Sequence, residues 1–311
     1  MARAPTARPT FGFSLRDFDY ADQVARLRHF GRAAEACGVS QSALSEQIRK
    51  LEDRLGMPLF ERTKRRVAPT ADAEGFLEQI ARVLQEAERL ADMAERRRAD
   101  GGLRLRVGAI ETLGPYYLPR VLATLRKARP DISLRLVEAK TEALTRALSR
   151  GELDVAFLAT PPTQSGLAAA SLFREPFLFA APVGHPLTLV EPLAIEALAG
   201  PDLLLLEEGH CLRDQALALC GGRPATRHAT SVETLWQMIA SGEGYSLLPA
   251  LAVESRPSLH AFVVVRALSN AAAERRISLC WRASDPRGGD YLKVAAVLRR
   301  DAPAACRAAP D

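Results

Sequence analysis

Two cysteines nine positions apart, Cys211 and Cys220, are the residues best suited to chemistry in this sequence. Cys211 follows His210 and stands two positions before Arg213, so a cationic side chain is expected on either side of its sulfur. Neighbouring positive charge and a helix N-terminus both favour the thiolate, which is the nucleophilic form of cysteine. The stretch 212–219 contains no Pro or Gly and is rich in helix formers, so it predicts a helix that begins near Cys211.

The spacing also limits how the two sulfurs could meet. Nine positions along a helix correspond to roughly 13 Å, whereas a disulfide needs Cα atoms within roughly 7 Å of each other. A bond between Cys211 and Cys220 would therefore require the helix to come apart, which is the behaviour of a switch. The alternative is that both thiols are buried and inert, as free cysteines often are. We interpret Cys37, Cys280 and Cys306 in that way.

Length and composition indicate a protein of several domains. The 311 residues allow two or more domains, and a hydrophobic content of 48% supplies their cores. The net charge of +5 permits an anionic partner. Five scattered cysteines argue against a secreted disulfide framework, and the basic N-terminus lacks the apolar core of a signal peptide. Since no apolar run is long enough to span a membrane, we expect a cytoplasmic protein with no membrane partner. We also expect neither a metal nor a cofactor.

The first part of the chain has the pattern of a winged helix-turn-helix. A turn at Gly38 precedes a helix predicted over 41–55, which Ser40 can cap. That helix would bury one apolar face and expose a polar, basic one, and a Lys-Arg-Arg cluster (64–66) follows between two short segments. The alternative is a solvated helical hairpin. The residues expected to reach base edges or phosphates are Ser40, Gln41, Ser42, Ser45, Gln47, Arg49, Lys50, Lys64 and Arg65.

Two stretches carry a resemblance to a known family. The run A-A-x-x-x-x-V-S-Q-S-A-L-S-x-Q-I-R-K-L-E…L-G-x-P-L-F-E-R (33–62) is similar to the DNA-binding domain of LysR-type transcriptional regulators. The run G-H-C-L-R-D-Q-A (209–216), closed by Cys220, resembles the peroxide-sensing loop of one group of regulators in that family. The resemblance implies double-stranded promoter DNA, hydrogen peroxide, RNA polymerase and a thioredoxin- or glutaredoxin-type reductant as partners, with self-association into a dimer and a tetramer.

The remaining patterns predict the arrangement of the chain. We expect an N-terminal all-α winged helix-turn-helix over 13–70 and a linker helix over 71–100, whose apolar stripe needs a partner helix. From residue 103 a βαβαβ order predicts an α/β regulatory domain over 103–311. The resemblance implies that this domain has the two-lobed periplasmic-binding-protein-like fold. Lobe I is then expected at about 103–160 and 268–300, and lobe II at about 161–267.

Ligands bind to α/β sheets at strand-to-helix turns, and Thr112 and Thr141 lie at two such turns. A threonine at a helix start is on its own most simply a cap. The resemblance implies instead that both threonines bind peroxide close to Cys211. It implies further peroxide contacts from His210, Asp214 and Gln215, and thiolate support from Arg213 and Arg275.

The chemistry implied by the resemblance is signalling, so we do not expect an enzyme. The Cys211 thiolate would attack peroxide to give a sulfenic acid, and Cys220 would then close a disulfide that unwinds the helix and changes DNA binding. Two features depart from the best-known relatives. Glu111 stands where Pro is common, and we expect it to point to solvent. The segment 221–224 is shorter and richer in Gly and Pro.

Three other functions are compatible with parts of the sequence. A LysR-type regulator could answer a small organic effector and keep its cysteines idle. A thiol peroxidase would consume peroxide continuously and lack sequence-specific affinity for DNA. A solute-binding protein would share the two-lobed fold, but the N-terminal helix-turn-helix and the missing signal peptide disfavour it.

Overall fold

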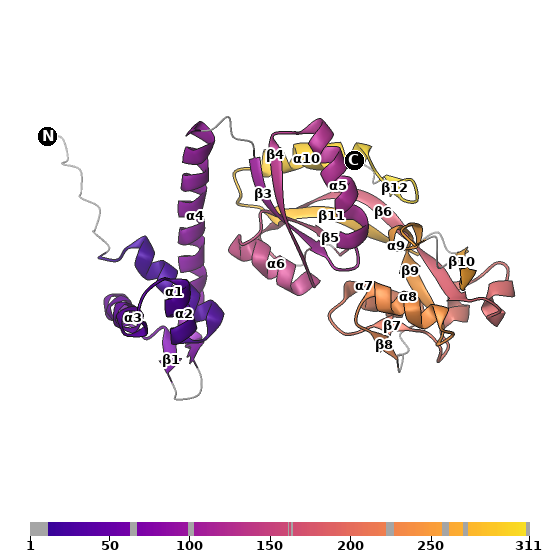
Figure 1. Cartoon of the computed structure of the whole chain (residues 1–311), viewed down its shortest axis with the longest axis horizontal. Helices are drawn as coiled ribbons and strands as arrows, with labels where there is room; N and C mark the ends of the chain where they lie inside the picture. The colour runs from indigo at the N-terminus through magenta and orange to yellow at the C-terminus, as the bar shows by residue number, and fades with distance from the viewer. Residues whose placement is uncertain are drawn as a thin grey trace. The chain divides into compact units, whose positions relative to one another are not determined.

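The structure is a computed structural model. It describes residues 12–62, 67–98, 103–160, 162, 164–221, 227–256, 261–269 and 273–308. The chain divides into two compact units, residues 1–100 and 101–311 (Figure 1). Among the described helices, none combines the length and the apolar character that a membrane span requires.

The first unit consists of helices and a two-stranded wing around one small core. The elements are α1 (Leu15–Leu27), α2 (Phe30–Ala36), α3 (Gln41–Leu55), β1 (Phe60–Arg62) and β2 (Val67–Pro69), and the two strands pair antiparallel. Gly38 takes a positive φ of 68° in the turn before α3. The Ser40 Oγ accepts a hydrogen bond of 3.2 Å from the Ala43 N–H and so caps that helix. The predicted winged helix-turn-helix fold is confirmed.

A long helix follows the wing. After a short 3-10 turn, η1 (Ala71–Ala73), helix α4 extends over Glu74–Arg98. Its first half packs against α1, where Ile80 is buried, but Phe76 and Leu90 are 46% and 69% exposed. Thr70, which precedes this turn, does not cap it with its side chain. The helix begins through the 3-10 turn, and the Thr70 hydroxyl donates instead to the Pro58 carbonyl at 2.9 Å.

In the second unit, one long strand passes through both halves of a mixed sheet. Strand β6 (Leu167–Pro182) pairs with β11 (Glu274–Arg282) along its first part and with β9 (Ser246–Pro249) and β10 (Val263–Ala267) along its second. The first part of β6 pairs with β11, a partner about one hundred residues away in sequence.

The parallel part of the sheet holds the strands predicted from the βαβαβ order. Strand β3 (Leu103–Ile110) lies between β4 (Ile132–Ala139) and β5 (Val155–Leu158) and is parallel to both. The sheet order is β10-β6-β11-β5-β3-β4. The helices of this unit are α5 (Gly114–Ala128), α6 (Thr141–Arg150), α7 (Cys211–Leu219), α8 (Val232–Ala240), α9 (Ala250–Glu254) and α10 (Gly288–Arg300). Helices α5 and α10 pack together, and Figure 1 shows α6 apart from them.

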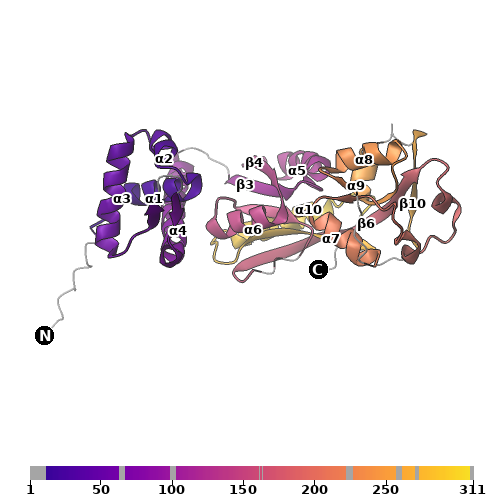
Figure 2. The ribbon, with the colours of Figure 1, turned by 90° about the horizontal axis from the view of Figure 1, so that it is seen from below.

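Two separate hydrophobic cores divide this unit into lobes. The lobe I core gathers side chains of β3, β5, α5, α10 and the first part of β6, among them Val107, Tyr117, Phe157 and Phe173. The lobe II core gathers those of α8, β9 and the second part of β6, among them Phe179, Trp236 and Leu247. Figure 2 shows helices α7, α8 and α9 grouped around the second part of β6. The two-lobed α/β fold expected from the sequence is therefore present.

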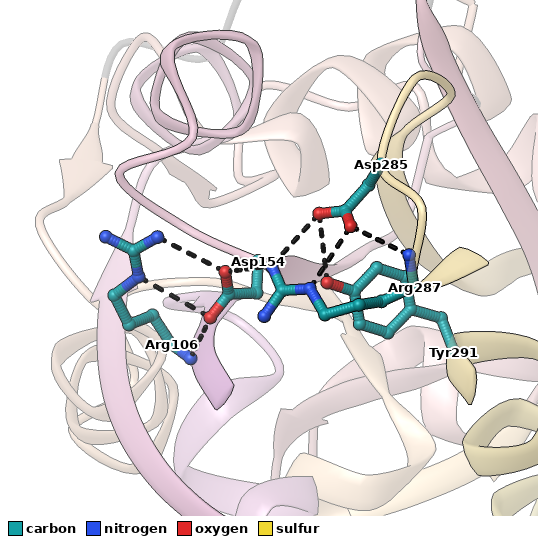
Figure 3. Close-up of polar contacts among 5 residues, drawn as sticks. All are labelled: Arg106, Asp154, Asp285, Arg287 and Tyr291. Atoms are coloured by element: carbon teal, nitrogen blue, oxygen red, sulfur yellow. Dashed lines mark hydrogen bonds and ion pairs between the residues drawn. The ribbon is translucent and has the colours of Figure 1, made fainter. Parts of the chain in front are cut away.

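A buried ionic network fixes the C-terminal helix to lobe I (Figure 3). The carboxylate of Asp154, before β5, accepts hydrogen bonds from the Arg106 backbone N–H at 2.7 Å and Nη2 at 3.2 Å, and from the Arg287 Nη2 at 2.6 Å. Asp285, in the turn before α10, accepts from Arg287 and from the Tyr291 hydroxyl, each at 3.0 Å. Both carboxylates are almost fully buried, and such charges are stable only when they are paired. The network therefore joins β3 and β5 to α10.

Candidate functional site

The two cysteines of interest lie at the ends of one helix. Helix α7 begins at Cys211, and Cys220 is its C-cap residue. Both side chains are buried, 8% and 3% exposed, and both are free thiols. Burial in the lobe II core raises the pKa of Cys220 to about 11. The predicted helix is confirmed, and its nine positions hold the two Cα atoms roughly 13 Å apart, too far for a disulfide while the helix is intact.

The residue before Cys211 is a buried histidine that lies between two carboxylates. His210 is 4% exposed, with its Nδ1 3.5 Å from the Glu111 Oε2 and its Nε2 4.0 Å from the Glu207 Oε1. Burial lowers the pKa of His210, and this outweighs the opposite effect of Glu111. The imidazole is therefore mainly neutral at pH 7. The expectation of a cation on this side of Cys211 is wrong because the sequence did not reveal the burial.

We expected Glu111 to point to solvent, but it does so only in part. Its side chain is 41% exposed, but its carboxylate faces the imidazole of His210. Together with burial it also raises the pKa of Glu138. The other predicted cation beside the cysteine, Arg213, has its Nη2 3.9 Å from the Glu208 Oε1 and is mostly buried. The segment 222–224, where the sequence departs from the best-known relatives, lies outside the described residues.

Thr112 lies in the turn after β3, and the arginine expected to support the thiolate contacts it directly. The Arg275 Nη1 donates to the Thr112 Oγ1 and the Nη2 donates to the Thr112 carbonyl, both at 2.9 Å. The Arg275 Nε donates to the Glu175 Oε2 at 2.8 Å. The structure thus brings Arg275 to Thr112, one of the predicted peroxide-binding residues, and the guanidinium is engaged there by Thr112 and Glu175.

Five buried side-chain polar atoms have no hydrogen-bond partner among the described residues, and besides those of Tyr117 and Trp236 three belong to predicted peroxide-binding residues. These three are the Thr141 Oγ1, the His210 Nε2 and the Gln215 Oε1. The amide nitrogen of Gln215 donates to the Ala159 carbonyl at 3.0 Å, so α7 is tied to the end of β5. Asp214 is not brought to this set. It is exposed, because Cys211, Leu212 and Ala216 form the buried face of α7.

The sequence analysis missed a lysine that holds the loop before Cys211. The Lys140 Nζ donates to the Glu207 Oε1 at 3.1 Å and to the Glu208 carbonyl at 3.0 Å. Gly209 has a φ of 92°, and a Cβ there would come within 3.0 Å of the Lys140 side chain. Lys140 is the residue before Thr141, and only its position at a strand-to-helix turn could have suggested a role.

The sequence analysis also missed a buried carboxylate. Glu175 lies on β6 between Phe173 and Phe177, next to Arg174, and its side chain is fully buried. A buried charge requires a partner, but the adjacent Arg174 makes the two residues look like an ordinary exposed charged pair in the sequence. No set of three His, Cys, Asp or Glu side chains in the described part of the chain is arranged to hold a metal ion.

The candidate DNA-contacting residues lie on the exposed side of α3 and its N-terminus. Gln41, Ser42, Arg49 and Lys50 are exposed, whereas Ser45 and Gln47 are half-buried. The Lys50 Nζ lies 2.7 Å from the Glu46 Oε1, and the Ser40 and Ser42 hydroxyls are 3.0 Å apart. Lys64 and Arg65 lie outside the described residues.

Comparisons with known proteins agree with this arrangement. Residues 15–74 match the family model of the bacterial regulatory helix-turn-helix protein, lysR family, and residues 98–302 match that of the LysR substrate binding domain. The hydrogen peroxide-inducible genes activator of Pectobacterium carotovorum is 40% identical over 92% of this chain and 96% of its own length. The DNA-binding transcriptional dual regulator OxyR of Escherichia coli is 39% identical over 92% and 95%, respectively.

Solved structures of similar proteins share the fold over most of the chain. A full-length OxyR variant from Pseudomonas aeruginosa superposes with a TM-score of 0.74 at 38% identity, over 92% of this chain and 95% of that one. A hydrogen peroxide-bound mutant of OxyR from Corynebacterium glutamicum has a TM-score of 0.60 at 32% identity, over 92% of both chains. The chain therefore belongs to the LysR family of helix-turn-helix regulators, among the hydrogen peroxide-inducible genes activators that include OxyR.

Proposed function

We propose that this chain is a cytoplasmic transcription regulator that senses hydrogen peroxide with Cys211 and Cys220. The observation that carries the proposal is the set of unpartnered buried atoms on Thr141, His210 and Gln215. A buried polar atom without a partner costs about 1–3 kcal/mol, so such a set favours a small molecule that can both donate and accept hydrogen bonds. Hydrogen peroxide has these properties, and one structural relative is described as bound to it.

The proposed chemistry consumes one peroxide for each switching event. The Cys211 thiolate attacks one peroxide oxygen and the O–O bond breaks. One oxygen stays on sulfur as a sulfenic acid, and the other leaves as hydroxide and takes a proton to become water. The Cys220 thiolate then attacks the Cys211 sulfur, the S–O bond breaks, and a second water leaves after protonation. Two thiols lose two electrons, which reduce one peroxide to two waters, so the reaction is a stoichiometric signal.

The second step requires helix α7 to unwind. The raised pKa of Cys220 keeps its thiol protonated while it is buried, and the intact helix separates the two sulfurs. Unwinding would remove both obstacles and repack the lobes. A thioredoxin- or glutaredoxin-type reductant would restore the helix by thiol–disulfide exchange.

In the proposal, the lobes act on DNA through the N-terminal unit. The winged helix-turn-helix over 13–70 binds promoter DNA with α3, and the linker helix over 71–100 pairs two chains. The exposed Phe76 and Leu90 of α4 support this pairing. A change in the lobes would alter how the paired DNA-binding domains are spaced in a dimer or tetramer, and so alter contact with RNA polymerase.

The decisive variant is Cys211→Ser. The full chain is mixed with one equivalent of hydrogen peroxide, and free thiols are counted. The DNA footprint of the treated chain is then recorded on a fragment that the reduced protein selects. We expect the unmodified chain and a Cys280→Ser control to lose two thiols and change footprint, and Cys211→Ser to do neither. A peroxide-dependent footprint in Cys211→Ser would exclude the proposal and leave a LysR regulator with idle cysteines.

A further inference from the structure

A completely buried ion pair links the two long antiparallel strands of the regulatory unit. The Arg275 Nε on β11 lies 2.8 Å from the Glu175 Oε2 directly across on β6, and both side chains are 0% exposed. Replacing such a pair by apolar residues of similar volume is often neutral or stabilising. Global stability therefore does not explain why two charged residues occupy these positions. Their other contacts indicate their role.

The remaining contacts hold both side chains in one orientation. The second carboxylate oxygen of Glu175 accepts a hydrogen bond of 3.0 Å from the Leu251 N–H at the start of α9. Arg275, fixed by Glu175 at its Nε, directs both terminal nitrogens at Thr112. The guanidinium has little freedom to turn, because each of its three nitrogens makes a hydrogen bond and its carboxylate partner is held at both oxygens.

The fixed orientation of Arg275 decides whether the Thr112 hydroxyl donates or accepts in the hydrogen bond between them. A guanidinium carries hydrogen-bond donors and no acceptor, so the Thr112 Oγ1 accepts in its bond with Arg275. A hydroxyl has a single proton, and that proton is not used in this bond. Among the described residues, the hydroxyl makes no other hydrogen bond. Cys211 shares the lobe I core with Leu113 and Leu251, the neighbours of this network.

We propose that Glu175 is a positioning residue for the peroxide reaction: through Arg275 it commits the Thr112 hydroxyl to donate its proton to bound peroxide. The recipient is the oxygen that leaves as hydroxide when the Cys211 thiolate attacks. Negative charge develops on that oxygen, and a donor fixed in advance has its largest effect where charge develops. This inference rests on the proposed function, because it requires peroxide to react at Cys211.

The test removes the Glu175–Arg275 ion pair and the Thr112 hydroxyl, first separately and then together. The Glu175→Gln/Arg275→Met double variant removes both charges at similar volume, which keeps the fold accessible. We expect the double variant and Thr112→Val each to lower the second-order rate constant for peroxide by about 10- to 100-fold. The triple variant should be no slower than Thr112→Val, since the pair acts only through the hydroxyl. Thr112→Ser, which retains a hydroxyl, should stay close to the unmodified rate.

A second readout separates positioning from a purely structural role. The rate of Cys211 alkylation by iodoacetamide across pH reports on the thiolate and does not need a proton from Thr112. All three nitrogens of Arg275 bond to Glu175 and Thr112 and none to the thiol, so we expect this profile to be unchanged in the double variant while the peroxide rate falls. Equal losses in both rates, or a triple variant much slower than Thr112→Val, would overturn the inference.

A matched control lies one position away on β11. Glu274 pairs with Arg174 of β6 at 2.6 Å and is 12% exposed, so Glu274→Gln breaks an ion pair between the same strands. It should leave the peroxide rate unchanged.

The unmodified chain distinguishes failure of the proposed function from failure of the role assigned to Glu175. If it forms no oxidised Cys211 with one equivalent of peroxide, the proposed function is wrong. If it does so while the double variant reacts at the same rate, only the role of Glu175 is wrong.

Discussion

Cys211 packs in the lobe I core, and Cys220, at the other end of the same nine-residue helix, packs in the lobe II core. The reduced thiols thus belong to different hydrophobic cores. A bond between them must draw at least one sulfur out of its core as well as unwind α7. Oxidation at this site would therefore alter the packing of a lobe and not only the conformation of one loop.

Removing the Thr141 hydroxyl should slow the peroxide reaction without weakening the fold. Its Oγ1 is buried and has no partner, so Thr141→Val should leave the free energy of unfolding unchanged or raise it by up to about 1–3 kcal/mol. The rate constant with peroxide should fall by roughly 10-fold or more. Thr145→Val is the control, because that hydroxyl donates to the carbonyls of Thr141 and Glu142.

In the control, stability should fall by about 0.5–1.5 kcal/mol while the peroxide rate stays the same. Urea unfolding and stopped-flow kinetics measure the two quantities. A Thr141→Val variant that reacts as fast as the unmodified chain would remove Thr141 from the set of peroxide ligands.

Releasing the loop before Cys211 should speed closure of the disulfide. Lys140→Met removes the hydrogen bonds to Glu207 and to the Glu208 carbonyl, which tie α6 to this loop. The ion pair is partly exposed, so global stability should change by less than about 1 kcal/mol. We expect amide exchange in the first turn of α7 to become faster and the step from sulfenic acid to disulfide to accelerate. The account fails here if closure is unchanged or slower than in Lys293→Met, which breaks an exposed pair on α10.

The buried thiol of Cys220 should make the reduced protein less stable at high pH. Burial raises its pKa from 9.0 to about 11. Between these values the unfolded chain loses a proton that the folded chain keeps, so stability falls as pH rises through this window and is unaffected by this group below it. The urea midpoint should therefore drop more steeply between about pH 8.5 and about pH 10.5 in the unmodified chain than in Cys220→Ser. Equal slopes in the two proteins would show that Cys220 is not buried as described.

The exposed basic face of α3 should bind DNA phosphates. Arg49 is exposed there, and Arg49→Ala should weaken binding to all sequences and reduce the slope of log affinity against log salt by about 1. Arg146→Ala, on α6 of the regulatory unit, also removes an exposed charge and should leave that slope unchanged. Identical salt dependence in the two variants would argue against Arg49 as a phosphate contact.

The fold was predictable where local patterns decide it. The absence of Gly and Pro after Cys211 predicted α7, and the βαβαβ order predicted from residue 103 begins there with β3. The first part of β6 does not follow from local patterns, because its pairing with β11 comes from far along the chain. Such pairing depends on tertiary contacts that a single sequence does not display.

The candidate site was predictable in its residue types more than in its electrostatics. Cys211, Thr141 and Gln215 could be found from motif and turn position, but the neutral state of His210 follows from burial that only the fold reveals. The contacts of Glu175 and Lys140 join segments far apart in sequence. Neither residue stands in a recognisable motif, so the fold was needed to connect them to Cys211.

The most direct test of the central claim is to oxidise the reduced chain briefly with one equivalent of hydrogen peroxide, then combine peptide mass spectrometry with amide exchange across residues 205–221. We predict a Cys211–Cys220 cross-link, unmodified Cys37 and Cys280, and loss of amide protection along α7. Two free thiols at Cys211 and Cys220, or a cross-link that leaves α7 as protected as before, would contradict the account.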